Sequence, residues 1–175
     1  MRTLVILLTL ALALGTSGCG DLLSLHALHT PRDRILDPAI EGRWENDDQL
    51  LTVQRSGDLY QVKLQSRSDP AGEPRDYHVH LVEIAGVRFA DVLWTEAVGH
   101  MILRVRLRDG QLHLAFFDSK WLRDRVPHAE ADVNNGATQA VLTEPTPQLR
   151  ALVARYAREP GAYDARELVY RRAPR

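Results

Sequence analysis

Apolar and polar residues alternate along most of the chain between Glu41 and Phe117, in short runs separated by turn residues. Successive side chains of a strand point to opposite faces, so apolar residues at every second position indicate a strand with one apolar face. This stretch therefore predicts a series of antiparallel β-strands. After Phe117 the apolar residues follow the three- and four-residue spacing of a helix. The pattern therefore predicts a mainly β fold: an antiparallel meander, a C-terminal amphipathic helix and a last strand.

Three hairpins can be registered from their two-residue turns, Gly57-Asp58, Ala85-Gly86 and Asp109-Gly110. The predicted cross-strand pairs are Val53 with Val62 and Leu51 with Leu64 in the first hairpin, Val82 with Phe89, His80 with Asp91 and His78 with Leu93 in the second, and Val105 with Leu114 and Leu103 with Phe116 in the third. The second hairpin is largely apolar on both faces. We therefore expect it to be covered on both sides.

Helical signals follow the third hairpin. Residues 117–126 predict a short helix capped by Asp118 or Ser119. A longer helix is predicted with Thr146 as N-cap, Pro147 in the first position and a stop at Pro160-Gly161. The residues of its apolar stripe are Leu149, Leu152, Val153 and Tyr156. Residues 167–172 are predicted to form the last strand.

The first twenty residues have the pattern of a secretory targeting segment. Leu4 to Leu14 is a run of eleven apolar or hydroxyl residues, which suits the core of a signal peptide and is too short to span a bilayer. The sequence Thr16-Ser17-Gly18-Cys19 resembles the lipobox of bacterial lipoproteins, although Thr16 stands where an aliphatic residue is usual. The resemblance implies that residues 1–18 are removed and that the Cys19 thiol receives acyl chains such as palmitate. The alternative is an ordinary signal-peptidase cut that leaves Cys19 as a free thiol.

Lipidation of Cys19 predicts a protein held on a bacterial membrane and facing the periplasm. The residue after the cysteine is Gly20 and not an aspartate, which resembles the pattern of lipoproteins that are passed to the outer membrane. Residues 19–40 are predicted to be a lipidated tether with a short docking helix over Leu22 to Leu28. Residues 41–175 are predicted to be a single β-rich domain. Because Cys19 is the only cysteine, no intramolecular disulfide can support this domain.

Gly42-Arg43-Trp44 opens the first long strand, and Arg171 and Arg172 lie in the last one. With the meander and the late helix between them, these residues resemble the lipocalin-like and calycin barrels, in which such a tryptophan closes one barrel end and a late arginine stacks on it. The resemblance implies an eight-stranded barrel whose cup can hold a small apolar ligand. An open twisted sheet with the helix packed on one face is the alternative architecture.

His78 and His80 share one strand face, and Asp91 is expected opposite His80. Two imidazoles and a carboxylate suit a metal ion, or a general base oriented by a carboxylate. The structural alternative is a cross-strand hydrogen bond between His80 and Asp91, which we favour because the sequence offers no further ligand and no nucleophile motif.

Four aromatic residues, Trp44, Phe89, Trp94 and Phe116, could line a ligand cavity or simply fill the core. The formal net charge of −1 argues against a nucleic-acid partner. No phosphate loop, paired cysteines or nucleophile-elbow motif is present, so no cofactor is predicted. We expect a non-catalytic, lipid-anchored envelope protein with a binding or structural role, either binding a small apolar ligand or a partner protein or serving as a structural component of the envelope. The alternative is a metal-dependent or acid–base enzyme centred on the His78, His80 and Asp91 group.

Overall fold

The computed structural model describes residues 23–94, 99–134 and 137–174. Its strands are Leu23–Ser24 (β1), Arg34–Ile35 (β2), Gly42–Glu45 (β3), Gln49–Ser56 (β4), Leu59–Ser66 (β5), Arg75–Ile84 (β6), Val87–Trp94 (β7), His100–Arg108 (β8), Gln111–Phe116 (β9), Ala129–Asn134 (β10), Ala137–Leu142 (β11) and Leu168–Arg172 (β12). Its helices are Ser119–Arg123 (α1) and Thr146–Tyr156 (α2), with 3-10 turns at Pro38–Ile40 (η1) and Pro160–Ala162 (η2).

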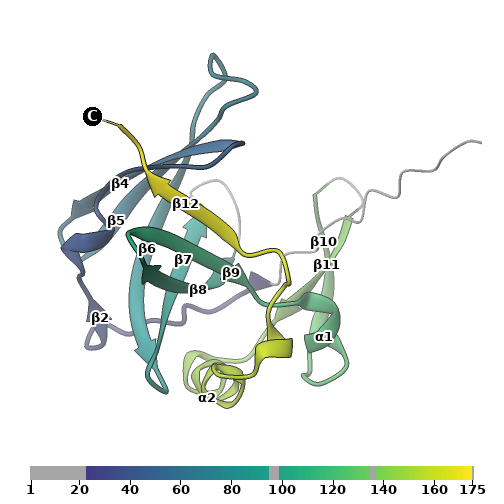
Figure 1. The fold of residues 1–175 in the computed structure, drawn as a ribbon. Helices are drawn as coiled ribbons and strands as arrows, with labels where there is room; N and C mark the ends of the chain where they lie inside the picture. The colour runs from purple at the N-terminus through teal and green to yellow at the C-terminus, as the bar shows by residue number, and fades with distance from the viewer. Residues whose placement is uncertain (1–22, 95–98, 135–136, 175) are drawn as a thin grey trace, which may run out of the picture.

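Eight antiparallel strands close into a barrel (Figure 1). The order around the barrel is β8, β7, β6, β5, β4, β3, β12 and β9, and β9 pairs back with β8 to complete the ring. Closure depends on β12, which pairs with β3 on one side and β9 on the other. The chain is therefore mainly β, as predicted. Of the two architectures considered from the sequence, the structure has the closed barrel and not the open sheet.

The three predicted hairpins form with the predicted register. Val53 pairs with Val62, His80 with Asp91 and Val105 with Leu114. In the second and third turns Ala85 and Asp109 each have φ of 53°, and the glycine after each has φ of 73°. Two successive left-handed residues define the tight turn whose twist matches that of paired strands. The turn residues and the alternation were therefore sufficient to set the register.

The barrel wall lies between two hydrophobic cores. The first fills the barrel and contains Trp44, Tyr60, Leu81, Leu103 and Tyr170 among others. The second lies outside the wall, where Val82, Ile84 and Phe89 of the β6–β7 hairpin pack against α2 and the residues around α1. Figure 1 shows α2 and the β10–β11 hairpin beside the barrel. The prediction that the second hairpin is covered on both faces is confirmed.

The N-terminal strap, residues 23–35, differs from the predicted helical tether. Its described residues form no helix: Leu23–Ser24 pairs with both β8 and β11, and Arg34–Ile35 pairs with β6. Extended pairing is possible because β8 extends beyond its pairing with β9 and β6 extends beyond its pairing with β5, which leaves backbone groups for β1 and β2 to bond. Leu28 is completely buried in the outer core. The domain therefore extends back at least to Leu23.

The C-terminal elements follow the sequence prediction with two differences. Asp118 caps α1 by accepting a hydrogen bond from the Trp121 amide. Thr146 does not cap α2 but is its first residue, and its hydroxyl donates to the Ala27 carbonyl of the strap at 2.8 Å. Strands β10 and β11 were not predicted.

Candidate functional site

A cavity of about 280 Å³ lies inside the barrel. It is built by the inward-facing residues of the barrel strands, which recur at every second position because side chains alternate along a strand. Its apolar lining residues include Leu51, Val53, Val79, Leu81, Ala90, Val92, Leu103, Val105 and Leu112. This volume is close to the lower limit of small-molecule pockets, about 300 Å³. The barrel interior is therefore an apolar cup and is not completely filled.

One end of the cavity is closed by Trp44 and the 3-10 turn η1. The Trp44 indole donates to the Ile40 carbonyl at 2.7 Å, and the Arg172 guanidinium lies 4.0 Å above the ring. Arg172 also donates to the carbonyls of Ala39 and Glu41, so it joins the turn to the last strand. Of the two arginines proposed from the sequence to stack on Trp44, Arg172 makes the contact, while Arg171 pairs with Glu45.

The other end of the cavity reaches solvent. Lining residues there, such as Leu64, Tyr77 and Met101, are only partly buried. Gln49 and Arg75 also line the cavity at this end, and the Tyr170 hydroxyl donates to the Gln49 side chain. Burial raises the pKa of Tyr170 to about 12, so the phenol remains protonated at neutral pH. We call this end the mouth.

The four aromatic residues predicted for a ligand cavity have different places in the structure. Phe116 lines the cavity. Trp44 is completely buried in the barrel core and closes its end. Phe89 faces the opposite side of the wall and stacks near Phe117 in the outer core, with ring centroids 6.1 Å apart. Trp94 ends β7, and its side chain lies outside the part of the chain that the structure describes.

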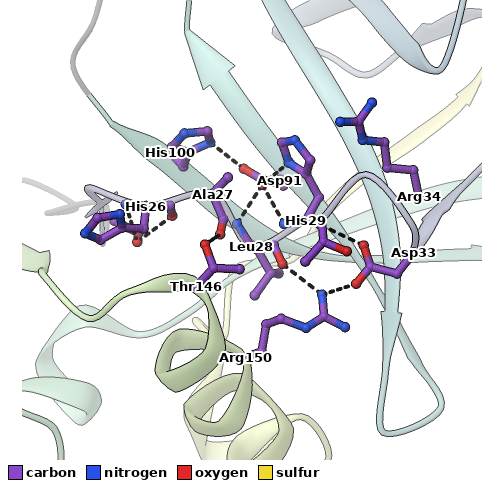
Figure 2. Close-up of polar contacts among 12 residues, drawn as sticks. His26, Ala27, Leu28, His29, Asp33, Arg34, Asp91, His100, Thr146 and Arg150 are labelled. Carbon is purple, nitrogen blue, oxygen red and sulfur yellow. Dashed lines mark hydrogen bonds and ion pairs between the residues drawn. The ribbon is translucent and has the colours of Figure 1, made fainter.

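Asp91 is the buried polar centre of the outer wall. Its side chain has no exposed surface and accepts four hydrogen bonds. The donors are the Leu28 amide at 2.7 Å, the His29 amide at 3.1 Å, His29 Nδ1 at 2.5 Å and His100 Nδ1 at 2.6 Å. Figure 2 shows these bonds converging on the carboxylate from the strap on one side and β8 on the other. Asp91 therefore fastens the strap to the barrel.

Ionisation of Asp91 is favoured by these contacts. Burial alone would raise its pKa, but hydrogen bonds from His100 and His29 hold the pKa well below the usual range of a carboxyl. The strap is also held from α2, since Arg150 donates to the Leu28 carbonyl at 2.9 Å and pairs with Asp33 at 2.5 Å (Figure 2).

The predicted group of His78, His80 and Asp91 is only partly assembled. The backbone pairing of His80 with Asp91 is as predicted, but the carboxylate binds His29 and His100. His80 instead stacks on His29, with ring centroids 3.8 Å apart. Burial, with the nearby charges of His29 and Arg34, lowers the pKa of His80 to about 4. His78 lies opposite Leu93, one pair further along the same hairpin face.

Sequence reasoning missed His29 and His100 as the partners of Asp91. His100 could have been found by aligning β8 with β7 in the sequence. Leu93 pairs with His100, so the His100 side chain lies diagonally across from Asp91. His29 carries no such signal, because it lies on the strap, 62 positions away from Asp91. Among the described residues, no group of three or more His, Cys, Asp or Glu side chains is arranged to hold a metal ion.

No protein-family model matches this sequence, and comparisons with curated proteins and with solved structures gave no significant match. Among residues 23–94, 99–134 and 137–174, no helix is long and apolar enough to cross a membrane. The geometry of the cavity and of the strap is therefore the basis for a functional assignment.

Proposed function

We propose that this protein is a lipid-anchored component of the bacterial cell envelope whose barrel binds a small apolar ligand without catalysis. The observation that carries the ligand part is the apolar cavity of about 280 Å³, closed at Trp44 and open at the mouth. A preformed, largely apolar concavity with a few polar groups is the usual form of a small-molecule site. Asp91 and its histidines lie on the outer side of the wall, where their bonds are used to hold the strap.

The anchor part of the proposal is supported by the sequence around Cys19, which lies outside the described residues. Cys19 precedes Leu23 by four residues, and an extended chain of that length reaches at most about 14 Å. Leu23 pairs with Met101, which lines the cavity. A lipid on Cys19 would therefore hold the barrel close to the membrane surface, with the outer membrane favoured by Gly20.

The ligand proposal can be tested by filling the cavity from its wall. Val62 lines the cavity and is partly buried, while its neighbour Gln61 is exposed on the same strand. We expect Val62→Trp to weaken binding of the apolar fluorophore N-phenyl-1-naphthylamine at least tenfold, and Gln61→Trp to leave it unchanged. Equal binding by the wild type and both folded variants would overturn the proposal, because the fluorophore would then bind elsewhere.

The anchor proposal is tested by the intact mass of protein recovered from membranes, for the wild type and Cys19→Ser. We expect a lipid-sized mass increase on residue 19 that is lost in the variant together with membrane retention. A free thiol at residue 19 would contradict the anchor while leaving the ligand proposal intact.

A further inference from the structure

Polarity changes along the axis of the cavity. Near the closed end the lining is apolar, with Val53, Leu81 and Val105, and the Tyr60 hydroxyl there is bonded to the backbone of Asp37. The remaining polar lining residues, Gln49, Arg75, Tyr77 and Tyr170, are at the mouth. A molecule that matches this lining has an apolar body and a single polar end.

Arg75 is the charged member of this lining. It pairs with Leu64 and begins the inward-facing row of β6 that continues through Tyr77, Val79 and Leu81. Val79 and Leu81 are buried in the barrel core, so strand parity places Arg75 on the inner face at the level of the mouth. Arg75 is exposed at this rim of the cavity, and the planar fork of its guanidinium suits carboxylate or phosphate oxygens.

Gln49 and Tyr170, which also lie at the mouth, can form further hydrogen bonds with a headgroup. Among the described residues that line the cavity, Arg75 is the one cationic residue. The Tyr170 hydroxyl is protonated at neutral pH and donates to Gln49, which leaves the amide nitrogen of Gln49 as a further donor. Donors from Gln49 and Arg75 both suit an acceptor-rich headgroup. A cationic headgroup would instead meet the guanidinium.

We propose that the cavity binds a single-chain amphiphile with an anionic headgroup, with the chain along the barrel axis and the headgroup at Arg75. This inference rests on the proposed ligand-binding function. The cavity has the volume of about nine water molecules, and a methylene occupies a similar volume, so a chain of about ten carbons fits. Fatty carboxylates and alkyl phosphates share this chemistry.

Four probes of one chain length test the proposal: decanoate, decyl phosphate, decanol and decyltrimethylammonium, each displacing N-phenyl-1-naphthylamine from the full chain. We expect the two anions to bind at least about tenfold more tightly than decanol, since one charge-assisted hydrogen bond accounts for that factor. Whichever anion binds more tightly identifies the headgroup. In Arg75→Gln this preference should disappear while decanol still binds.

Arg67→Gln is the matched control, because Arg67 lies on the β5–β6 loop and pairs with Glu45 without lining the cavity. It should retain the preference for anions. Equal binding of anions and decanol by the wild type, or tighter binding of the cation, would overturn the headgroup assignment. Failure of all four probes and of the fluorophore to bind would instead overturn the proposed ligand-binding function itself.

Discussion

Replacing Asp91 with alanine should be among the most destabilising single changes in this domain. The carboxylate is fully buried and accepts bonds from the Leu28 and His29 amides and from the His29 and His100 rings. Its removal leaves these donors without their buried acceptor. Both amides belong to the strap, so the effect should be concentrated there.

The magnitude follows from the cost of leaving buried partners unpaired. Removing one member of a buried charged pair costs about 3–5 kcal/mol, which is a large part of the total stability of about 5–15 kcal/mol of a typical domain. With a urea slope of about 2 kcal/mol/M, the unfolding midpoint should fall by roughly 1.5–2.5 M. The strap keeps its bonds from Thr146 and Arg150, so partial docking should remain.

Urea unfolding gives the global effect, and hydrogen exchange of the Leu28 and His29 amides gives the local one. Asp76→Ala is the control, because Asp76 is 52% exposed and pairs with Lys63, a residue outside the strap, and a surface ion pair contributes about 0–1 kcal/mol. A loss of stability below about 1 kcal/mol in Asp91→Ala, or unchanged protection of the Leu28 amide, would refute the view that Asp91 fastens the strap.

Two further predictions concern His80 and Arg172. Since the pKa of His80 is lowered from 6.5 to about 4, its contribution to stability is complete above pH 6.5 and is lost as pH falls toward 4. The free energy of unfolding of the wild type, measured in urea, should therefore fall by about 1–2 kcal/mol between pH 8 and 5. If a His80→Gln variant loses the same free energy over this pH range, His80 is not the cause. Arg172→Ala should lower the free energy of unfolding by about 2 kcal/mol through loss of its stacking on Trp44 and its bonds to η1. Arg171→Ala, whose side chain is 65% exposed, should cost less than about 1 kcal/mol, and equal melting temperatures for the two variants would exclude the stacking role.

The hairpins could be predicted because their information is local. In the third hairpin Asp109 and Gly110 impose the turn, and a shift of one residue would turn Val105 and Leu114 from the core to the other face. Closure of the barrel has no comparable local signal. It depends on β12 pairing with β3, and the contact of Arg172 with the Glu41 carbonyl spans 131 positions. Only the resemblance of Trp44 and a late arginine, Arg171 or Arg172, to lipocalin-like barrels indicated closure beforehand.

The contacts of Asp91 were harder to predict because this residue faces outward from the barrel. From strand parity, Asp91 lies on the same face as Phe89, and a carboxylate on an outer face is normally solvated. The sequence predicted that this face is covered, but no side-chain pattern reveals that the strap covers Asp91 and supplies backbone amides to it. Strands β10 and β11 were missed for a related reason: β11 is held by pairing with β1 of the strap, which the sequence had suggested was helical.

The strap also changes what an N-terminal anchor would do. A flexible tether would let the domain move away from the membrane, whereas residues 23–35 are part of the folded unit and share a buried core residue, Leu28, with α2 and the barrel wall. The covalent path from Cys19 to this unit is only four residues long. Weakening the Asp91 contacts would therefore lengthen the effective tether without altering the cavity, because the cavity and Asp91 lie on opposite sides of the same wall. In the lipid-anchored, ligand-binding protein that we propose, ligand binding and distance from the membrane should thus respond independently to mutation, the first to Arg75 and Val62 and the second to Asp91.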